Sequence, residues 1–258
     1  MLRMRQIALI ASDLQLIQNQ FESLFKLSVC HRDPGVAKFG LENFLMPISN
    51  SFLEVVAPFT DDSAGARYLT TRNGDSGYMV IMQTDDIVGA RTRVTELGIR
   101  LILDGKGSSE STDGIQLHPK DLPGAIAELR WNEGDSVLDG PWSPAGDNWQ
   151  PFRNTDIIES IIGAEISAYV PEILASQWSA VLDIPSARTE QHGLHIQLDD
   201  AILRFVQVRD DRGEGLSQLD FMINDVHHVR ARGDALGLLQ NPNLLEVCGI
   251  EINLIESS

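Results

Sequence analysis

Two glutamates, a glutamine and a methionine occupy matching places in a duplicated part of this sequence. Each copy begins with a strand-like run, which carries Gln6 or Met79, and ends with another strand-like run, which carries Glu54 or Glu128. A buried carboxylate can remove or return a proton beside a carbonyl group. Two facing carboxylates repel each other unless a metal ion, a shared proton or a neighbouring donor relieves the repulsion. Glu54 and Glu128 are therefore the predicted catalytic residues.

The elements that must position these side chains follow a βαβββ pattern. Each first strand leads into a helix that begins at an aspartate, an N-cap residue, and has apolar side chains at helical spacing. Asp86 follows Asp13 by 73 positions, and Glu128 follows Glu54 by 74 positions, which predicts a pseudo-symmetric pair around a shared cavity. The expected strands cover residues 6–11, 27–31, around 38–41 and 51–57 in the first copy, and 78–84, 100–103, 114–118 and 125–131 in the second.

Two further units follow a segment that is rich in Gly and Pro and has no period. The third unit has strands at 161–170, 192–198 and 201–208 and a helix over 171–182; the fourth has strands at 219–224 and 249–255 and a helix that begins at Asp225. The sequence therefore predicts an α+β protein with a first domain over residues 1–132, a linker over 133–157 and a second domain over 158–258.

Composition limits the classes of partner. With 20 Lys and Arg against 37 Asp and Glu, the formal net charge is -17, which repels nucleic acid and anionic membrane surfaces. The apolar run near the start is too short for a signal peptide, so we expect a cytoplasmic protein. The two cysteines, Cys30 and Cys248, show no metal-binding or disulfide spacing and are expected to be small buried side chains.

Three sequence runs together resemble the vicinal oxygen chelate superfamily, which includes glyoxalase I, methylmalonyl-CoA epimerase, extradiol dioxygenases and bleomycin-resistance proteins. These runs are Ala-Ser-Asp-Leu at the end of the first strand, Phe-Leu-Glu-Val-Val-Ala-Pro at 52–58, and His-Pro-Lys-Asp-Leu-Pro-Gly-Ala-Ile-Ala-Glu-Leu at 118–129. The resemblance covers residues 5–131 well and 158–256 in part. It implies two tandem domains, each made of two paired βαβββ units whose sheets curl around a cavity that holds a divalent metal.

Carried over by position, the metal ligands of this superfamily fall on Gln6, Glu54, Met79 and Glu128. A glutamine oxygen and two carboxylates suit Zn, Ni, Co, Mn or Mg. Met79 is not an expected ligand, because a thioether is too soft for these ions. The resemblance therefore implies a metal held by Gln6, Glu54 and Glu128, and the alternative is a cavity that works without metal.

Three further side chains are candidates for substrate binding. Arg67 lies in the connection between the first two units, where a mobile segment could close over an anionic substrate. His31 faces either the cavity or solvent from a short apolar strand. His118 either lines the cavity mouth or caps an exposed loop, and the turn residues that follow it favour the loop.

The second domain departs from the superfamily pattern. Its four corresponding positions fall near Ala164, Arg204, Gln218 and Asn253, a set that cannot hold a divalent cation. We expect a structural role there, or a pocket for an uncharged or anionic ligand. Two tandem domains pair either within one chain or across a homodimer, and the sequence leaves both open.

The expected function is that of a glyoxalase-like or epimerase-like lyase or isomerase that acts on a small carbonyl compound by carboxylate proton transfer, with or without a metal. The alternative is a metal-free protein that binds and sequesters a small molecule, as bleomycin-resistance proteins do. An extradiol dioxygenase is disfavoured, because neither half of the chain offers two histidines at the matched positions.

Overall fold

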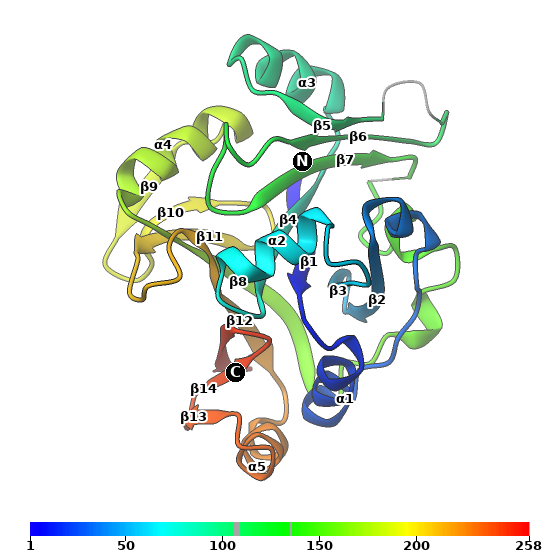
Figure 1. Ribbon diagram of the computed structural model, residues 1–258, viewed down its shortest axis with the longest axis vertical. Coiled ribbons are helices and arrows are strands. Elements are labelled where there is room, and N and C mark those ends of the chain that lie inside the picture. The colour runs from blue at the N-terminus through cyan, green and yellow to red at the C-terminus, as the bar shows by residue number, and fades with distance from the viewer. Residues whose placement is uncertain (106–108, 135, 258) are drawn as a thin grey trace. The chain divides into compact units, whose positions relative to one another are not determined.

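The computed structural model describes residues 1–105, 109–134 and 136–257 (Figure 1). Residues 106–108, 135 and 258 belong to the predicted first domain, linker and second domain, respectively, and lie outside the described residues. The described helices are α1 (Leu14–Phe25), α2 (Ala64–Thr71), α3 (Ile87–Glu96), α4 (Pro171–Leu182) and α5 (Val226–Ala235), with short 3₁₀ helices η1 (Pro34–Phe39), η2 (Ser143–Ala145) and η3 (Gln150–Phe152).

The strands form a seven-stranded and an eight-stranded sheet. In the first sheet the order is β2-β3-β1-β4-β7-β6-β5, and in the second it is β13-β14-β15-β12-β8-β11-β10-β9. The strands are β1 (Leu2–Ile10), β2 (Leu41–Ile48), β3 (Ser51–Pro58), β4 (Ser76–Thr84), β5 (Leu101–Asp104), β6 (Thr112–Leu117), β7 (Ile126–Asn132), β8 (Ile158–Ala168), β9 (Ser186–Thr189), β10 (Gly193–Gln197), β11 (Ile202–Gln207), β12 (Gly215–Ile223), β13 (Leu239–Asn241), β14 (Leu244–Val247) and β15 (Ile250–Glu256).

Each sheet is mixed because a helix connects the first strand of a repeat to the rest of it. The pairs β4–β7, β8–β11 and β12–β15 are parallel, whereas the neighbouring pairs β2–β3, β6–β7, β10–β11 and β14–β15 are antiparallel. A parallel pair requires a crossover, and the helix supplies it. The predicted α+β fold of four repeats paired into two mixed sheets is confirmed; the first repeat has three strands, β1–β3, and each of the others has four.

The predicted helix starts are confirmed by their caps. The side chains of Asp13, Asp86 and Asp225 each accept a hydrogen bond from a backbone N–H three residues further on. These bonds satisfy N–H groups that have no partner within the helix. Helix α4 begins instead with Pro171, which lacks an N–H and whose fixed φ suits the first turn.

The first repeat differs from its prediction in its middle elements. The expected strand over residues 27–31 is wrong, because only His31 pairs there, in a single bridge to Leu45. The expected strand near 38–41 is replaced by η1, which begins at Pro34 and ends before Gly40, a residue with a left-handed φ of 73°. Helix α2 was not predicted, although Ser63 caps its first turn by accepting a hydrogen bond from the N–H of Ala66.

Internal contacts divide the chain into two compact units. Unit 1 consists of Met1–Gln6, Tyr78–Ser143 and Gly163–Leu216, and unit 2 consists of Ile7–Gly77, Pro144–Ile162 and Ser217–Ser258. Strands β1, β4, β8 and β12 therefore contribute residues to both units. The boundaries predicted above, which group repeats in pairs along the chain, stay a prediction.

Each unit has its own buried apolar core. In unit 1, Trp178 of α4 is fully buried, and its indole N–H donates to the carbonyl of Pro123 at 3.0 Å. In unit 2, Phe25 of α1 packs edge-on against Phe221 of β12, with ring centroids 5.4 Å apart. Among the described residues, no helix has the length and apolar character needed to cross a membrane.

Candidate active site

Gln6 lies on β1 in unit 1, with 2% of its surface exposed. Its side-chain oxygen Oε1 accepts a hydrogen bond of 2.6 Å from the indole Nε1 of Trp142, which is fully buried. Trp142 belongs to the segment that the sequence predicts as a linker. The oxygen that the superfamily resemblance assigns to a metal is therefore engaged by the protein's own chain.

Two buried arginines lie beside Gln6 on the same strand. Arg5 is fully buried and donates to the carbonyl oxygens of Leu138 at 2.6 Å and Gly140 at 2.9 Å. Its guanidinium carbon lies 5.7 Å from the centroid of the Trp142 ring, a cation–π distance. Burial, followed by repulsion from Arg3, lowers the pKa of Arg5 to about 9. A fixed positive charge thus occupies the neighbourhood of Gln6.

Arg3, on the same strand as Arg5 and Gln6, makes further polar contacts. Its Nε and Nη2 atoms donate to Oε1 of Gln83 at 3.0 and 2.8 Å, and Nη2 also donates to the carbonyl of Leu138. Because a guanidinium can only donate, Gln83 must turn its oxygen toward Arg3. We call Leu138–Trp142, the stretch held by Arg3, Arg5 and Gln6, the inserted segment.

Met79 and Glu128 lie on one face of the parallel pair β4–β7. Met79 is in register with Ile126, and Ile81 is in register with Glu128, so the alternation of each strand sends Met79 and Glu128 to the same side. Oε1 of Glu128 forms an ion pair with Nε of Arg130 at 3.1 Å. The ion pair favours the ionised form of Glu128.

Glu54 lies on β3 in unit 2 and is 6% exposed. The side-chain amide nitrogen of Asn43 donates to Oε1 of Glu54 at 2.6 Å. The orientation of this amide is fixed, because the Asn43 oxygen accepts a bond of 2.8 Å from the N–H of Asp33. Glu54 is thus a buried carboxylate with a dedicated hydrogen-bond donor.

The four predicted positions do not form a suitable site for a hard divalent cation. The Gln6 oxygen faces an indole N–H, Met79 offers only a thioether, and Glu128 is paired with a guanidinium. Within the described ranges, no group of three or more His, Cys, Asp or Glu side chains has an arrangement that would hold a metal. Metal binding by Gln6, Glu54 and Glu128 stays a prediction that this donor set does not favour, and we derive no chemical step through a metal.

The three predicted substrate-binding residues lie in different settings. Arg67 lies on helix α2 instead of a loop, is exposed, and donates to the carbonyl of Asp62. His118 follows β6 in a turn, where its Nδ1 accepts from the N–H of Lys120 at 3.2 Å. This bond accords with a loop-capping role.

His31 is partly exposed in unit 2 and lies close to the backbone of Gly146. A Cβ atom at Gly146 would lie 2.9 Å from Nδ1 of His31, so only glycine fits there without movement. The histidine therefore packs against the predicted linker. The roles of Arg67, His31 and His118 in binding a substrate stay predictions.

Two buried carboxylates of the third and fourth repeats were missed by sequence reasoning. Glu165 of β8 is 4% exposed and lies 3.5 Å from Arg204 and 3.2 Å from Arg209, all in unit 1. The predicted position Ala164 is its immediate neighbour and therefore points to the other face. An acidic residue inside the apolar run Ile-Gly-Ala-Glu-Ile was the signal that could have found it.

The fourth repeat has a similar arrangement in unit 2. Asp220 is 4% exposed, and its Oδ1 accepts from the side-chain amides of Gln218 and Asn253, both at 3.1 Å. The predicted positions Gln218 and Asn253 thus converge on a carboxylate that the prediction omitted. These contacts satisfy a buried charge, which would otherwise destabilise the fold.

Comparison with known proteins gave no match to a family model. The ethylmalonyl-CoA/methylmalonyl-CoA epimerase of Cereibacter sphaeroides is 24% identical over 129 residues, which are 49% of this chain and 96% of that protein. A solved structure of a hypothetical protein from Staphylococcus aureus covers 100% of both chains, with a TM-score of 0.69 and 11% identity. A variant of the Streptomyces coelicolor methylmalonyl-CoA epimerase, solved with 2-nitronate-propionyl-CoA, covers 50% of this chain and 96% of that one, with a TM-score of 0.44 and 23% identity.

These similarities agree with the architecture. The Staphylococcus aureus structure shares the fold over the whole length of the chain, and the Cereibacter sphaeroides epimerase matches about half of it in sequence. Four repeats, the first with three strands and the others with four, form the two mixed sheets, and in the last three repeats the first and last strands pair in parallel. The sequence similarity to the epimerase and the fold shared with the Staphylococcus aureus structure agree with the resemblance to the vicinal oxygen chelate superfamily.

Proposed function

We propose that this protein is an epimerase-like isomerase that acts on a small carbonyl compound, with Glu54 and Glu128 as its proton-transfer residues. The observation that carries the proposal is that buried Glu54 and partly buried Glu128 lie at equivalent positions of two repeats, where Asn43 donates to Glu54 and Arg130 pairs with Glu128. Sequence similarity to an epimerase supports the reaction class.

The chemistry follows from what each carboxylate can do. An ionised glutamate removes the proton beside the carbonyl, and the electron pair of the broken C–H bond moves into an enolate. Return of a proton from water to the opposite face of that carbon inverts the centre, and the glutamate releases the proton that it took to the solvent. Over one cycle the glutamate regains its ionised state, and no oxidant or reductant is required.

The surroundings of each glutamate suit proton transfer. Arg130 favours the ionised form of Glu128 and keeps its carboxylate oriented. Asn43 can donate to Glu54 in either protonation state, because a protonated carboxyl still has an acceptor oxygen. Arg3 and Arg5 lie in the same unit as Glu128 and supply a positive potential that favours a negatively charged enolate.

The substrate class follows from the relatives. The Cereibacter sphaeroides protein is an ethylmalonyl-CoA/methylmalonyl-CoA epimerase, and the Streptomyces coelicolor structure holds a 2-nitronate-propionyl-CoA. We therefore propose a 2-substituted acyl thioester as the first substrate to test. A thioester carbonyl acidifies the neighbouring C–H, so a carboxylate base is strong enough for this reaction.

Hydrogen exchange provides the test. Purified protein is incubated in D₂O with (2R)- or (2S)-methylmalonyl-CoA, and deuterium at carbon 2 is followed by mass spectrometry together with inversion. Glu128→Gln and Glu54→Gln should each slow exchange about 10²–10⁴-fold, the usual contribution of a general acid or base. Glu159→Gln, which changes an exposed glutamate on β8, is the matched control and should keep full activity. Equal rates in all three variants would refute the assignment.

A binding protein of the bleomycin-resistance type is the second candidate. The hydrogen bond from Trp142 to Gln6 favours this second function, because the indole then takes up the oxygen that the superfamily resemblance assigns to a metal. Such a protein would bind an acyl thioester without exchanging its proton. Isothermal titration beside the exchange assay separates the two functions.

A further inference from the structure

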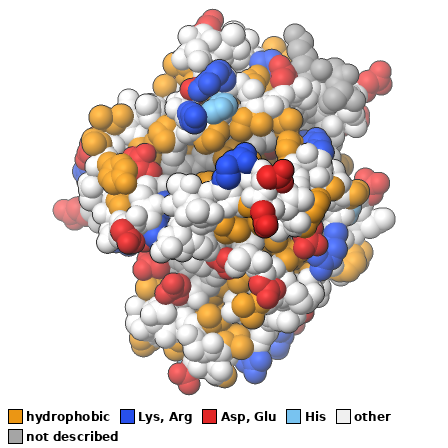
Figure 2. All heavy atoms as spheres, in the orientation of Figure 1, with side chains coloured by type: hydrophobic (Ala, Val, Ile, Leu, Met, Phe, Trp, Pro, Cys, Tyr) orange, Lys and Arg blue, Asp and Glu red, His pale blue; other side chains and the backbone are white. Residues whose placement is uncertain are grey.

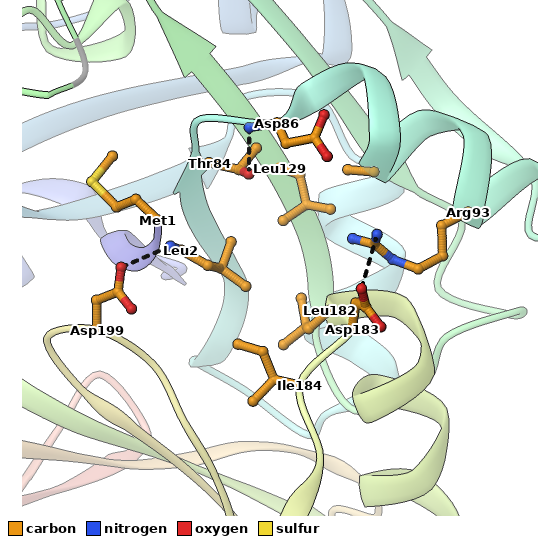
Figure 3. Close-up of a pocket in the computed structure, with 11 residues that line it drawn as sticks. Met1, Leu2, Thr84, Asp86, Arg93, Leu129, Leu182, Asp183, Ile184 and Asp199 are labelled. Atoms are coloured by element: carbon orange, nitrogen blue, oxygen red, sulfur yellow. Dashed lines mark hydrogen bonds and ion pairs between the residues drawn. The ribbon is translucent and has the colours of Figure 1, made fainter.

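A cavity of about 270 Å³ lies within unit 1, away from the glutamates of the proposed reaction (Figure 3). The start of β1, the first turns of α3 and the end of α4 surround it, and Leu129 of β7 lies in its floor. Glu128 and Leu129 are neighbours on one strand, so their side chains point to opposite faces of the sheet. The cavity is therefore independent of the proposed epimerase chemistry.

The floor of this cavity is apolar. Figure 3 shows Leu129, Leu182 and Ile184 near its middle, and Leu2 and Ala90 complete it. Leu129 and Leu182 are 1% and 3% exposed, so they belong to the packed core. A floor of this kind favours a ligand with a nonpolar body.

The rim of the cavity is acidic. Asp86 uses its Oδ1 to cap α3 through the N–H of Gly89 at 2.8 Å, and Asp199 uses its Oδ2 to accept from the N–H of Leu2 at 2.9 Å. Within the described part of the chain, neither carboxylate forms an ion pair, and each keeps a second oxygen for a ligand.

Of the arginines that the structure describes, Arg93 alone lines the cavity, and it is already engaged. Arg93 donates to the carbonyl of Val181 at 2.8 Å and faces the carboxylate of Asp183 at 3.8 Å. The charges of Arg93 and Asp183 offset each other, and the ammonium of Met1, which also lines the cavity, pairs with Asp85 at 2.7 Å. Neither of these two cations forms an ion pair with Asp86 or Asp199 at the rim. An anionic ligand is therefore disfavoured, and a cationic ligand is favoured.

We propose that this cavity binds a small organic cation, in which an ammonium group meets Asp86 and Asp199 and a nonpolar body of a few carbon atoms covers the apolar floor. Its volume lies just below the usual range for drug-sized ligands, about 300–1,000 Å³, which limits the ligand to a small amine. The protein's net charge of -17, with acidic side chains spread over the face shown in Figure 2, attracts cations toward the surface.

Three ring compounds of similar size test the charge preference. Benzylammonium, benzyl alcohol and benzoate are titrated separately into the protein at low salt, and binding is followed by calorimetry and by the shift in melting temperature. We expect benzylammonium to bind at least about 10-fold more tightly than benzyl alcohol, and benzoate to bind most weakly. Added salt should weaken the binding of benzylammonium and leave the binding of benzyl alcohol unchanged. Equal binding of the amine and the alcohol would overturn the proposal.

Two substitutions locate the site. Asp86→Asn removes a charge but keeps the helix cap, because asparagine is as good an N-cap residue as aspartate. Together with Asp199→Asn it should reduce benzylammonium binding about 10-fold or more and leave benzyl alcohol binding unchanged. Asp13→Asn at the corresponding cap of α1 in unit 2 is the matched control and should bind like the natural protein. Unchanged amine binding in the double variant would place the amine elsewhere and refute this site.

Discussion

The indole Nε1 of Trp142 donates a 2.6 Å hydrogen bond to Oε1 of Gln6, and both residues are buried. The two residues are 136 positions apart, so this bond joins the first strand to the segment after β7. Arg5 joins the same two parts of the chain, because its guanidinium donates to the carbonyl oxygens of Leu138 and Gly140. The inserted segment is thus a structural part of unit 1.

The first prediction concerns the bond between Trp142 and Gln6. Trp142→Phe should lower the free energy of unfolding by about 1–3 kcal/mol, because the buried Gln6 oxygen loses its indole donor. Urea unfolding measures the change. In the double variant Trp142→Phe/Gln6→Leu both polar partners are absent, so the loss should be smaller than the sum of the two single losses. Simple additivity would show that the bond contributes no stability of its own.

The second prediction concerns Arg5. Arg5→Met should lower the free energy of unfolding by about 2–4 kcal/mol, because the carbonyl oxygens of Leu138 and the buried Gly140 lose a charged donor. Arg5→Lys should recover only part of this loss, since an ammonium cannot reproduce the fork of the guanidinium. The exposed pair of Arg188 and Glu172 provides the control, and Arg188→Met should change stability by less than about 1 kcal/mol.

The third prediction concerns metal ions. Excess Ni, Co, Zn, Mn or Mg should change the melting temperature by less than about 1 °C, because a ligand stabilises a protein only when it binds the folded state. Elemental analysis of the purified protein is the companion measurement. Near-stoichiometric metal that Glu54→Ala removes would contradict this expectation and support the ligand set implied by the superfamily resemblance.

The fourth prediction concerns pH. Burial raises the pKa of the Cys30 thiol to about 12, whereas in the unfolded chain the thiol should titrate near its ordinary value, about 8.5. Between these values the unfolded chain loses a proton that the folded protein retains, so this group's contribution to stability falls as pH rises from about 8.5 toward 12. Cys30→Ala should lessen the alkaline loss of stability measured by urea unfolding between pH 8 and 10. An identical pH dependence in the variant would contradict the assignment.

Local signals in the sequence were enough to predict most of the elements. The helices that begin after Asp13, Asp86 and Asp225 were predictable because capping depends on residues only a few positions apart. Strand β2 was not predicted, since its nearly continuous burial leaves no alternation of polar and apolar residues.

The contacts around the candidate site were not predictable in the same way. The partner of Gln6 lies in a segment without any period, and no local pattern connects Trp142 to the first strand. Glu165 was missed because a shift of one residue along a strand changes the face on which a side chain lies. The residue types at the site could thus be chosen from the sequence, whereas their hydrogen-bond partners depend on the folded chain.

The composition of the two units has a consequence for folding during synthesis. Unit 2 contains residues from Ile7–Gly77 near the start of the chain and from Ser217–Ser258 near its end. A domain made from one continuous stretch can fold as soon as it leaves the ribosome. Unit 2 has no such opportunity, because its early strands and helices must wait for β12–β15 and α5 to be translated. We therefore expect apolar surface of the first repeat to stay exposed until Ser217–Ser258 has been translated, and the nascent chain to need protection from aggregation up to that point.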